Sequence, residues 1–319
     1  MKTLIKNGLL IDSANQVQAY LNLILEDGKV VAVTEEEPEA DRVIDATGKV
    51  VAPGFIDIHM HEDPVKDGKI EFCIFDAMLR MGVTTAVGGN CGINVYDPVK
   101  YLDMVEKDGA PVNVMLFAGH QYFREAAGAL DKYAPVTKEQ QEHMKKGLEK
   151  ALEAGCVGIS YGLRYVPGTG RDEFLDTASC CEKEHRMISA HVRDDEDRVF
   201  GAVAEVAEAG KLYNIPVQVS HIGSMAGFGQ MKQLLRQVDG YRMNGIDVAC
   251  DCYPYFAFST RIGATTYDDG WLERYHCDYS ACQLTEGKYK GQRCTPETFA
   301  EMRRDFPECL TVCYVMDRK

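Results

Sequence analysis

The sequence predicts an α/β protein whose main part is a (β/α)8 barrel of the TIM type, preceded by a small β-sandwich portion. From Val50 onward, seven short apolar runs of strand type alternate with amphipathic segments of helical periodicity. Such alternation is typical of a parallel sheet, and this many short, buried strands favour a barrel over an open sheet. The first 50 residues lack this alternation and form the second part.

The β-sandwich portion is predicted for residues 1–50. The runs "TLIKNGLLID", "YLNLILEDGKVVAV" and "ADRVIDATGKVVAP" are apolar or alternate between apolar and polar residues, as strands do. Asn-Gly, Asp-Gly and Thr-Gly-Lys supply the turns between them.

The barrel is predicted for residues 51–319, where strands 1 to 7 are expected in order. These runs are "GFIDIH", "VTTAVGGNC", "VNVMLFAGH", "CVGISYGL", "MISAHV", "IPVQVSHI" and "DVACDCYPY". Helical segments such as "TKEQQEHMKKGLEKALEAG" separate them. Residues 260–309 break the alternation and are predicted to be an insertion after strand 7, in the role of a lid over the barrel's C-terminal face.

Composition limits the partners. A formal net charge of −14, a pI of about 5.1 and the lack of a basic cluster argue against nucleic acid and anionic membranes. The chain starts without a signal-peptide pattern and has no apolar run of about 18 residues, so we expect a cytoplasmic protein. Its 12 cysteines are then expected to be reduced thiols. The oligomeric state stays open.

Five potential metal ligands fall at the ends of four predicted strands. His59 and His61 are two residues apart, so their side chains point to the same face if strand 1 includes them. Cys91, His191 and His221 end strands 2, 5 and 6. Each residue alone could instead be a buried thiol, a hydrogen-bonded core histidine or a solvated loop histidine. Together they favour a metal site, because barrel active sites assemble at this face.

The ligand types indicate zinc. One thiolate and two imidazoles suit a borderline-soft ion, and three protein ligands with one open position are typical of a catalytic zinc site. We expect Cys91, His191 and His221 to form one tight site. His59 and His61 would hold or approach a second, weaker metal, and whether one or two metals bind stays open.

The order of motifs resembles a known family. "APGFIDIHMHEDP", "GVTTAVGGNCGIN", "LFAGHQYFR", "GISYGLRYVPG", "SAHVRDD", "VSHIG" and "DCYPYFAFST" are similar to the N-acyl-D-amino-acid deacylases (D-aminoacylases) of the amidohydrolase superfamily. The resemblance covers essentially the whole chain. "GNCG" is its most specific element, because this family has a cysteine where many amidohydrolases have a carbamylated lysine. Dihydroorotase-like and hydantoinase-like functions are therefore less favoured.

The resemblance implies a zinc-dependent hydrolase. The reaction would cleave the amide of an N-acyl-D-amino acid to a carboxylate and a D-amino acid by metal-activated water. Tyr161 is our candidate donor to the oxyanion or carbonyl, with a half-buried structural tyrosine as the alternative.

The substrate's α-carboxylate also needs donors. By resemblance, Tyr253 and Ser259 are the matching positions, whereas Gly223 stands where some relatives have a lysine. Arg193 could compensate, or could instead pair with acidic neighbours. His120 is expected to support a ligand by a hydrogen bond.

The family's general acid/base aspartate, on barrel strand 8, is absent from this chain, and Asp317 does not match it. The chain is therefore expected to be truncated, or to be completed by another C-terminal segment or chain. One alternative is a catalytically silent, zinc-binding chain, and a weaker one is action on another cyclic or acyl amide. A second, structural zinc site at Cys277, Cys282, Cys294 and Cys309 is disfavoured, because their spacings lack paired knuckles.

Overall fold

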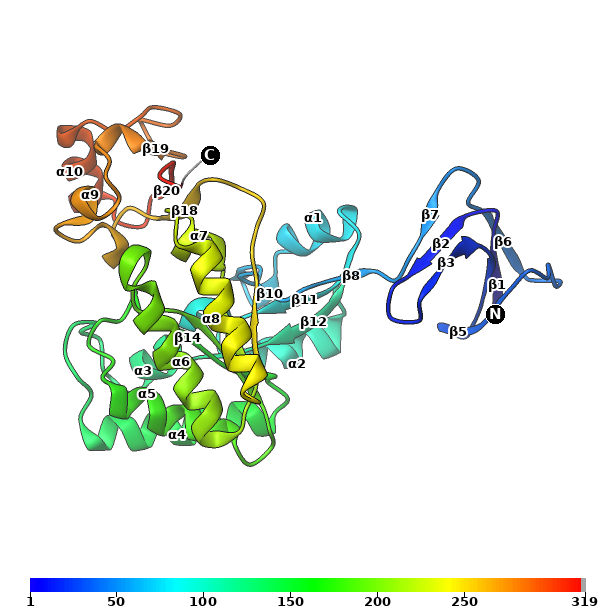
Figure 1. Cartoon of the computed structure of the whole chain (residues 1–319), viewed down its shortest axis with the longest axis horizontal. Coiled ribbons are helices and arrows are strands. Elements are labelled where there is room, and N and C mark those ends of the chain that lie inside the picture. Colours follow the sequence, from blue (N-terminus) through cyan, green and yellow to red (C-terminus); the bar gives the residue numbers. More distant parts are fainter. Residues whose placement is uncertain (317–319) are drawn as a thin grey trace. The chain divides into compact units, whose positions relative to one another are not determined.

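A computed structural model of the chain describes residues 1–316 (Figure 1). Asp317 lies outside the described residues. The chain divides into two compact units, Met1–Phe55 and Ile56–Lys319. Among residues 1–316, no helix has both the length and the apolar character that crossing a membrane requires.

The N-terminal unit consists of two small sheets. One has the strand order β5-β4-β1-β6 and the other the order β3-β2-β7. Leu4, Leu10 and Ile24 are almost fully buried and form its core. The strands are β1 (Lys2–Lys6), β2 (Leu9–Asp12), β3 (Val17–Tyr20), β4 (Asn22–Glu26), β5 (Lys29–Thr34), β6 (Arg42–Asp45) and β7 (Val50–Val51).

The larger unit contains an arc of parallel barrel strands. The strands are β8 (Phe55–Asp57), β11 (Val83–Gly88), β12 (Asn113–Leu116), β13 (Ala118–Gly119), β14 (Gly158–Gly162), β15 (Met187–His191), β16 (Val217–Val219) and β17 (Val248–Cys250). They form two sheets, β12-β11-β8 and β13-β14-β15-β16-β17. Only Phe117 separates β12 from β13, and the amide of Val157 donates to the carbonyl of Leu116, so the two sheets are continuous.

The arc therefore has seven barrel positions within residues 1–316, because β12 and β13 occupy one of them. No pairing between the outer strands β8 and β17 is found among the described residues. This open (β/α) barrel confirms the predicted fold class, with strands 1 to 7 in the expected order.

Helices connect the strands and cover the outside of the arc (Figure 1). They are α1 (Ile74–Arg80), α2 (Pro98–Asp108), α3 (His120–Ala126), α4 (Lys138–Glu153), α5 (Arg171–Ala178), α6 (Val199–Tyr213), α7 (Ile222–Ala226) and α8 (Met231–Met243). A short hairpin, β9 (Val65–Lys66) and β10 (Lys69–Ile70), precedes α1. Thr137 and Gln140 form a capping box at the start of α4, which fixes where that helix begins.

The core lies between the strands and these helices. Leu148 of α4, Ile159 of β14 and Phe174 of α5 are completely buried in it. Each such side chain contributes about 1.5–3 kcal/mol through burial. This packing holds the strand ends, and therefore the loops that follow them, in fixed positions.

Residues 258–316 form a C-terminal lobe with its own core, where the sequence predicted an insertion. Its sheet has the antiparallel order β18-β20-β19. Trp271 and Phe299 stack in the core with ring centroids 5.2 Å apart. The elements are β18 (Phe258–Arg261), α9 (Trp271–Arg274), β19 (Cys282–Leu284), α10 (Pro296–Asp305) and β20 (Leu310–Cys313).

Candidate metal centre

Cys91 sits in a tight turn just after β11. It has a positive φ of 57°, which is uncommon for a residue with a side chain. Gly89 and Gly92 make the turn possible, because both also have positive φ and a Cβ on Gly89 would lie 2.3 Å from the carbonyl oxygen of Phe117. The strand predicted to end at Cys91 thus ends at Gly88, and the turn aims the thiol inward.

Buried polar side chains hold this turn in place. Glu62 accepts hydrogen bonds from the amides of Gly89 and Val95 and from the side chain of Asn94. Asn90 donates to the carbonyl of Ile58 and accepts from Ser189 on β15. The turn is thereby fastened to strands on both sides, so the position of the thiol is determined by the barrel rather than by a free loop.

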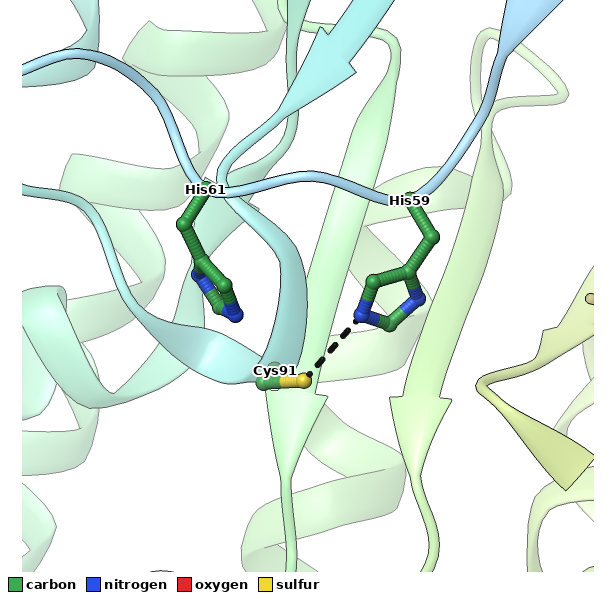
Figure 2. Close-up of side chains that lie close together, drawn as sticks. All are labelled: His59, His61 and Cys91. Carbon is green, nitrogen blue, oxygen red and sulfur yellow. Dashed lines mark hydrogen bonds between the residues drawn. The ribbon is translucent and has the colours of Figure 1, made fainter. Parts of the chain in front are cut away.

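His59 and His61 lie in an irregular segment beyond β8, which ends at Asp57. Figure 2 shows both imidazole rings extending from this segment toward Cys91. The i, i+2 spacing was expected to act through strand alternation. The two rings instead converge from non-strand backbone, and Asp57 orders this segment by accepting from the amide of His59.

His191 and His221 also lie close to Cys91. His191 is the last residue of β15, whereas His221 is the N-cap of α7 and has a φ of 34°. Their ring centroids are 4.4 Å apart. Ser224 lies 2.9 Å from Nδ1 of His221, so the Nε2 atom of that ring is directed to the sulfur.

The donor atoms form two overlapping groups. Within each group, all donor atoms lie within 4.8 Å of one another. One group contains Cys91, His191 and His221, and the other contains His59, His61 and Cys91. The structure therefore brings together all five residues that the sequence analysis selected, and Cys91 is common to both groups.

The local electrostatics favour an ionised thiol. Burial opposes ionisation of Cys91, but the charge of His59 and hydrogen bonds from the surrounding histidines hold its pKa well below the usual value. Burial also acts on His59, yet Cys91 and Asp251 raise the pKa of its ring to about 10. Burial and the nearby His221 lower the pKa of His191 to about 4. A thiolate and a neutral imidazole are the forms that bind metal.

Asp251 is a site residue that the sequence analysis missed. It directly follows β17, and its carboxylate lies 3.3 Å from Nδ1 of His59. It also accepts from the backbone amide of His221, at 2.6 Å, and from Gln218. Burial raises its pKa, but these bonds more than offset the effect and keep the pKa below 3.8. Its place at the end of an apolar run, which it shares with the candidate ligands, was the available signal.

A cavity of about 580 Å³ opens beside the five candidate ligands. Side chains from the C-terminal lobe, including Phe258, Thr260 and Tyr275, form part of its wall. The predicted carboxylate-binding residues Tyr253 and Ser259 line the same cavity. The hydroxyl of Tyr253 is buried without a hydrogen-bond partner among the described residues, and burial raises its pKa to about 12, so it remains a donor at neutral pH.

Tyr161, our candidate oxyanion donor, does not line this cavity. Its side chain is fully buried, its hydroxyl is 3.1 Å from that of Thr177 on α5, and its ring packs against Phe174. Strand alternation explains this placement, because the preceding Ser160 points inward and bonds the Cys91 turn. Tyr165 lines the cavity instead, with its ring centroid 4.4 Å from that of His191.

Two further predicted residues have other partners. Arg193 forms a bidentate ion pair with Glu205, with its shortest contact at 2.8 Å, and does not line the cavity. Arg193 thus pairs with an acidic residue of α6 and not with the acidic residues that adjoin it in the sequence. His120 is buried, and its Nε2 atom lies 3.0 Å from Glu173 rather than beside a candidate ligand.

The cysteines of the C-terminal lobe do not form a third metal-type cluster. Among residues 1–316, the two groups that share Cys91 are the ones in which three or more donor side chains converge. Cys294 and Cys309 are buried in the core of the lobe.

Several known proteins are similar to this chain. Residues 42–162 match the model of the amidohydrolase family. The chain is 31% identical over 283 residues to an N-acyl-D-glutamate deacylase of Alcaligenes xylosoxydans xylosoxydans, a match that covers 80% of this chain and 57% of the relative. A D-aminoacylase of the same organism is 28% identical, with 81% and 58% covered. The chain thus spans a little over half the length of these relatives.

A solved structure extends the comparison to the fold. The crystal structure of an N-acyl-D-glutamate deacylase from Bordetella bronchiseptica, complexed with zinc and a phosphonate inhibitor, superposes with a TM-score of 0.84. The sequences are 27% identical, and the superposition covers 99% of this chain and 72% of that one. The barrel and the N-terminal unit both have their counterparts in it.

Proposed function

Because this chain belongs to the amidohydrolase family, we propose that it takes part in zinc-dependent hydrolysis of N-acyl-D-amino acids to a carboxylate and a D-amino acid. The convergence of Cys91, His191 and His221 beside a cavity carries this proposal. The D-aminoacylase and N-acyl-D-glutamate deacylase relatives supply the substrate class. Their similarity over 80% and 81% of this chain supports the extension.

The donor set fits a zinc ion. Two ligands at about 2.3 and 2.0 Å from a tetrahedral ion are separated by about 3.5 Å. The Cys91 sulfur lies 3.6 Å from Nε2 of His221, close to that separation. In addition, Nδ1 of His191 is buried with no hydrogen-bond partner among the described residues, a costly arrangement that a ligand would relieve. We therefore assign the tight site to these three residues.

His59 and His61 are assigned to a second, weaker site. Cys91 would be shared between the sites, since its sulfur lies 3.4 Å from Nε2 of His59. Occupation of this site must displace the proton that Asp251 and Cys91 favour on His59, whose pKa is about 10. We expect that competition to lower the affinity at neutral pH, and we therefore assign the weaker site to this pair.

Zinc, when bound, activates water and polarises the scissile carbonyl. The chain's own residues must hold the substrate against it. Tyr165 takes the place we had expected for Tyr161, because burial keeps its hydroxyl protonated and its ring lies beside His191. A hydroxyl donor here can stabilise negative charge that develops on the carbonyl oxygen.

Tyr253 and Ser259 are assigned to the substrate's α-carboxylate. Both line the cavity, and both offer a hydroxyl donor. Arg193 is not included, because Glu205 already neutralises it. Hydrogen bonds from neutral donors compensate a carboxylate less than an ion pair does, so the metal's charge must supply part of the attraction.

The cavity favours a substrate with an uncharged side chain. Three carboxylates line it, from Asp57, Asp195 and Asp251, whereas no lysine or arginine does so within residues 1–316. Arg274 reaches Asp195 at 3.2 Å, but this pair is neutral as a whole. A glutamate-type side chain would lack a cationic partner here, although one of the relatives acts on N-acyl-D-glutamate.

The alternative is a zinc-binding chain without turnover. This alternative rests on the resemblance, which places the family's general acid/base aspartate on a further barrel strand. Amino acid release from pooled N-acetyl-D-amino acids, with the L-series as control, separates the two functions. D-selective release that Cys91→Ala abolishes supports the hydrolase, whereas zinc binding without release supports the silent chain.

A further inference from the structure

Two cysteines face each other across the sheet of the C-terminal lobe. The antiparallel register of β19 and β20 pairs Cys282 directly with Cys313. Their sulfur atoms are 3.4 Å apart and share a hydrogen bond, and both side chains are completely buried. This pair lies outside the candidate metal centre and plays no part in the proposed hydrolysis.

The backbone already meets the requirement for a disulfide. Directly opposed residues in antiparallel strands have Cα atoms about 4.5–5.5 Å apart, within the range of about 4.4–6.8 Å that disulfides use. The sulfurs would have to approach from 3.4 Å to about 2.05 Å, a change that small side-chain rotations can supply.

The other cysteines of the lobe lack such a partner. Cys309 directs its sulfur to backbone carbonyls at 3.7 and 3.9 Å. For Cys277 and Cys294, the described contacts include none between sulfur atoms at hydrogen-bond distance. The close contact of Cys282 with Cys313 is therefore specific to one register position of the sheet rather than a consequence of a cysteine-rich segment.

The surroundings make one of the two thiols the better nucleophile. The hydrogen bond with Cys313 lowers the pKa of Cys282, and Tyr267 and Arg293 act in the same direction against the effect of burial. The thiolate is the reactive form in both oxidation and disulfide exchange. Cys313 remains a thiol and is placed to attack an oxidised Cys282.

We propose that Cys282 and Cys313 form a redox-active dithiol, which a peroxide or a small disulfide oxidises reversibly to an intramolecular disulfide. With hydrogen peroxide, the Cys282 thiolate attacks one oxygen, the O–O bond breaks, and a sulfenic acid and hydroxide form. The Cys313 sulfur then attacks the sulfenic sulfur, and the sulfenic oxygen leaves as water with the proton of the Cys313 thiol. Two thiols and one peroxide thus yield one disulfide and two waters, and a thiol reductant reverses the change.

The bond would act on the wall of the cavity. Cys313 pairs on its other side with Phe258 of β18, and the neighbouring Ser259 pairs with Val312. Phe258 and Ser259 both line the cavity. A covalent link between β19 and β20 would therefore stiffen the strand that holds this part of the wall, and it would restrict the lobe in the unfolded state as well.

Thiol mapping on the whole, zinc-loaded chain tests the proposal. The protein is reduced, freed of reductant and treated with hydrogen peroxide or with glutathione disulfide. Remaining thiols are then alkylated, and peptides are identified by mass spectrometry without reduction. We expect a peptide pair cross-linked through Cys282 and Cys313, the loss of two free thiols beyond any lost at exposed cysteines, and a rise in Tm of a few degrees that dithiothreitol reverses.

Matched variants sharpen the assignment. Cys282→Ala and Cys313→Ala should each abolish the cross-link and the reversible rise in Tm. Cys294→Ala removes a buried cysteine of the same lobe without a sulfur partner and should leave both effects intact. The mapping of the unaltered chain decides the matter even if a variant fails to fold. Cross-links to other cysteines, a mixed disulfide with glutathione alone, or both thiols still free after complete oxidation of Cys73 would each overturn the proposal.

Discussion

The Sγ atom of Cys91 lies 3.4 Å from Nε2 of His59. The same sulfur lies 3.6 Å from Nε2 of His221, a member of the other group of donors. Cys91 thus belongs to both groups of donors, so a substitution of this residue changes both groups at once. The histidines, in contrast, each belong to one group.

This sharing predicts an asymmetry between variants. Cys91→Ser should lower zinc affinity at both sites, by more than about 100-fold at the tight one, because a hydroxyl is a poor ligand for zinc. His61→Ala should weaken only the second site. Zinc titration against a chromogenic chelator measures both affinities. The assignment of Cys91 to both sites would be contradicted if the two variants lost zinc affinity equally at both sites. It would also be contradicted if Cys91→Ser left the affinity of the tight site unchanged.

Asp251 is expected to support metal binding without being one of the five candidate ligands. It holds Nδ1 of His59 and the backbone amide of His221, so Asp251→Asn should lower zinc affinity by about 10- to 100-fold. Asp195→Asn is the control, because this second cavity carboxylate pairs with Arg274 and Tyr275 instead. Equal affinities for Asp251→Asn and the control would exclude the supporting role.

Asp251 also makes stability depend on pH. Its pKa is lower in the folded chain than the ordinary 3.8, so its contribution is present above about pH 4 and is lost as pH falls through the folded value. Urea unfolding of the metal-free chain between about pH 2 and 6 measures this effect. The difference in unfolding free energy between the unaltered chain and Asp251→Asn should shrink toward low pH. A difference that stays constant would mean that the carboxylate's charge has no role in stability.

The convergence of the five candidate ligands could be predicted from sequence because each follows an apolar run, and such runs end at one face of a barrel. His191 is the clearest case, as the last residue of β15. The exact backbone could not be predicted: Cys91 and His221 both have positive φ, which the turn and the helix start impose after the strands have ended. Asp251 also follows an apolar run, but the sequence analysis missed it, because a carboxylate after a strand is common.

Tyr161 illustrates a different limit. The sequence placed it at the end of a strand, but every residue of β14 is buried, so the alternation of apolar and polar residues that reveals the inner face is missing. Ser160 is the inward residue and Tyr161 packs against α5. Which residues of β14 face the barrel interior and which face the helices depends on how the helices pack. The sequence of the strand alone does not determine it.

The two tyrosines provide a matched pair of variants. Tyr165→Phe removes a hydroxyl from the cavity wall, and we expect kcat for N-acyl-D-amino acid hydrolysis to fall by about 10- to 1,000-fold with little change in zinc affinity. Tyr161→Phe removes a hydroxyl that contacts Thr177 and should leave kcat unchanged while costing about 1 kcal/mol of stability. A loss of activity in Tyr161→Phe alone would restore the original assignment.

The charge of the cavity wall makes a prediction about the substrate's side chain. N-acetyl-D-glutamine and N-acetyl-D-glutamate have nearly the same shape, so a comparison isolates the effect of the second carboxylate. With Asp57, Asp195 and Asp251 in the wall and no lysine or arginine lining it in the described part of the chain, the glutamine compound should bind about tenfold or more tightly. Calorimetric titration of the zinc-loaded chain measures this preference without requiring turnover. Tighter binding of the glutamate compound would show that a cationic group reaches the cavity. Arg274 would then be the first residue to replace, because its side chain, turned away from Asp195, would bring a positive charge to the wall.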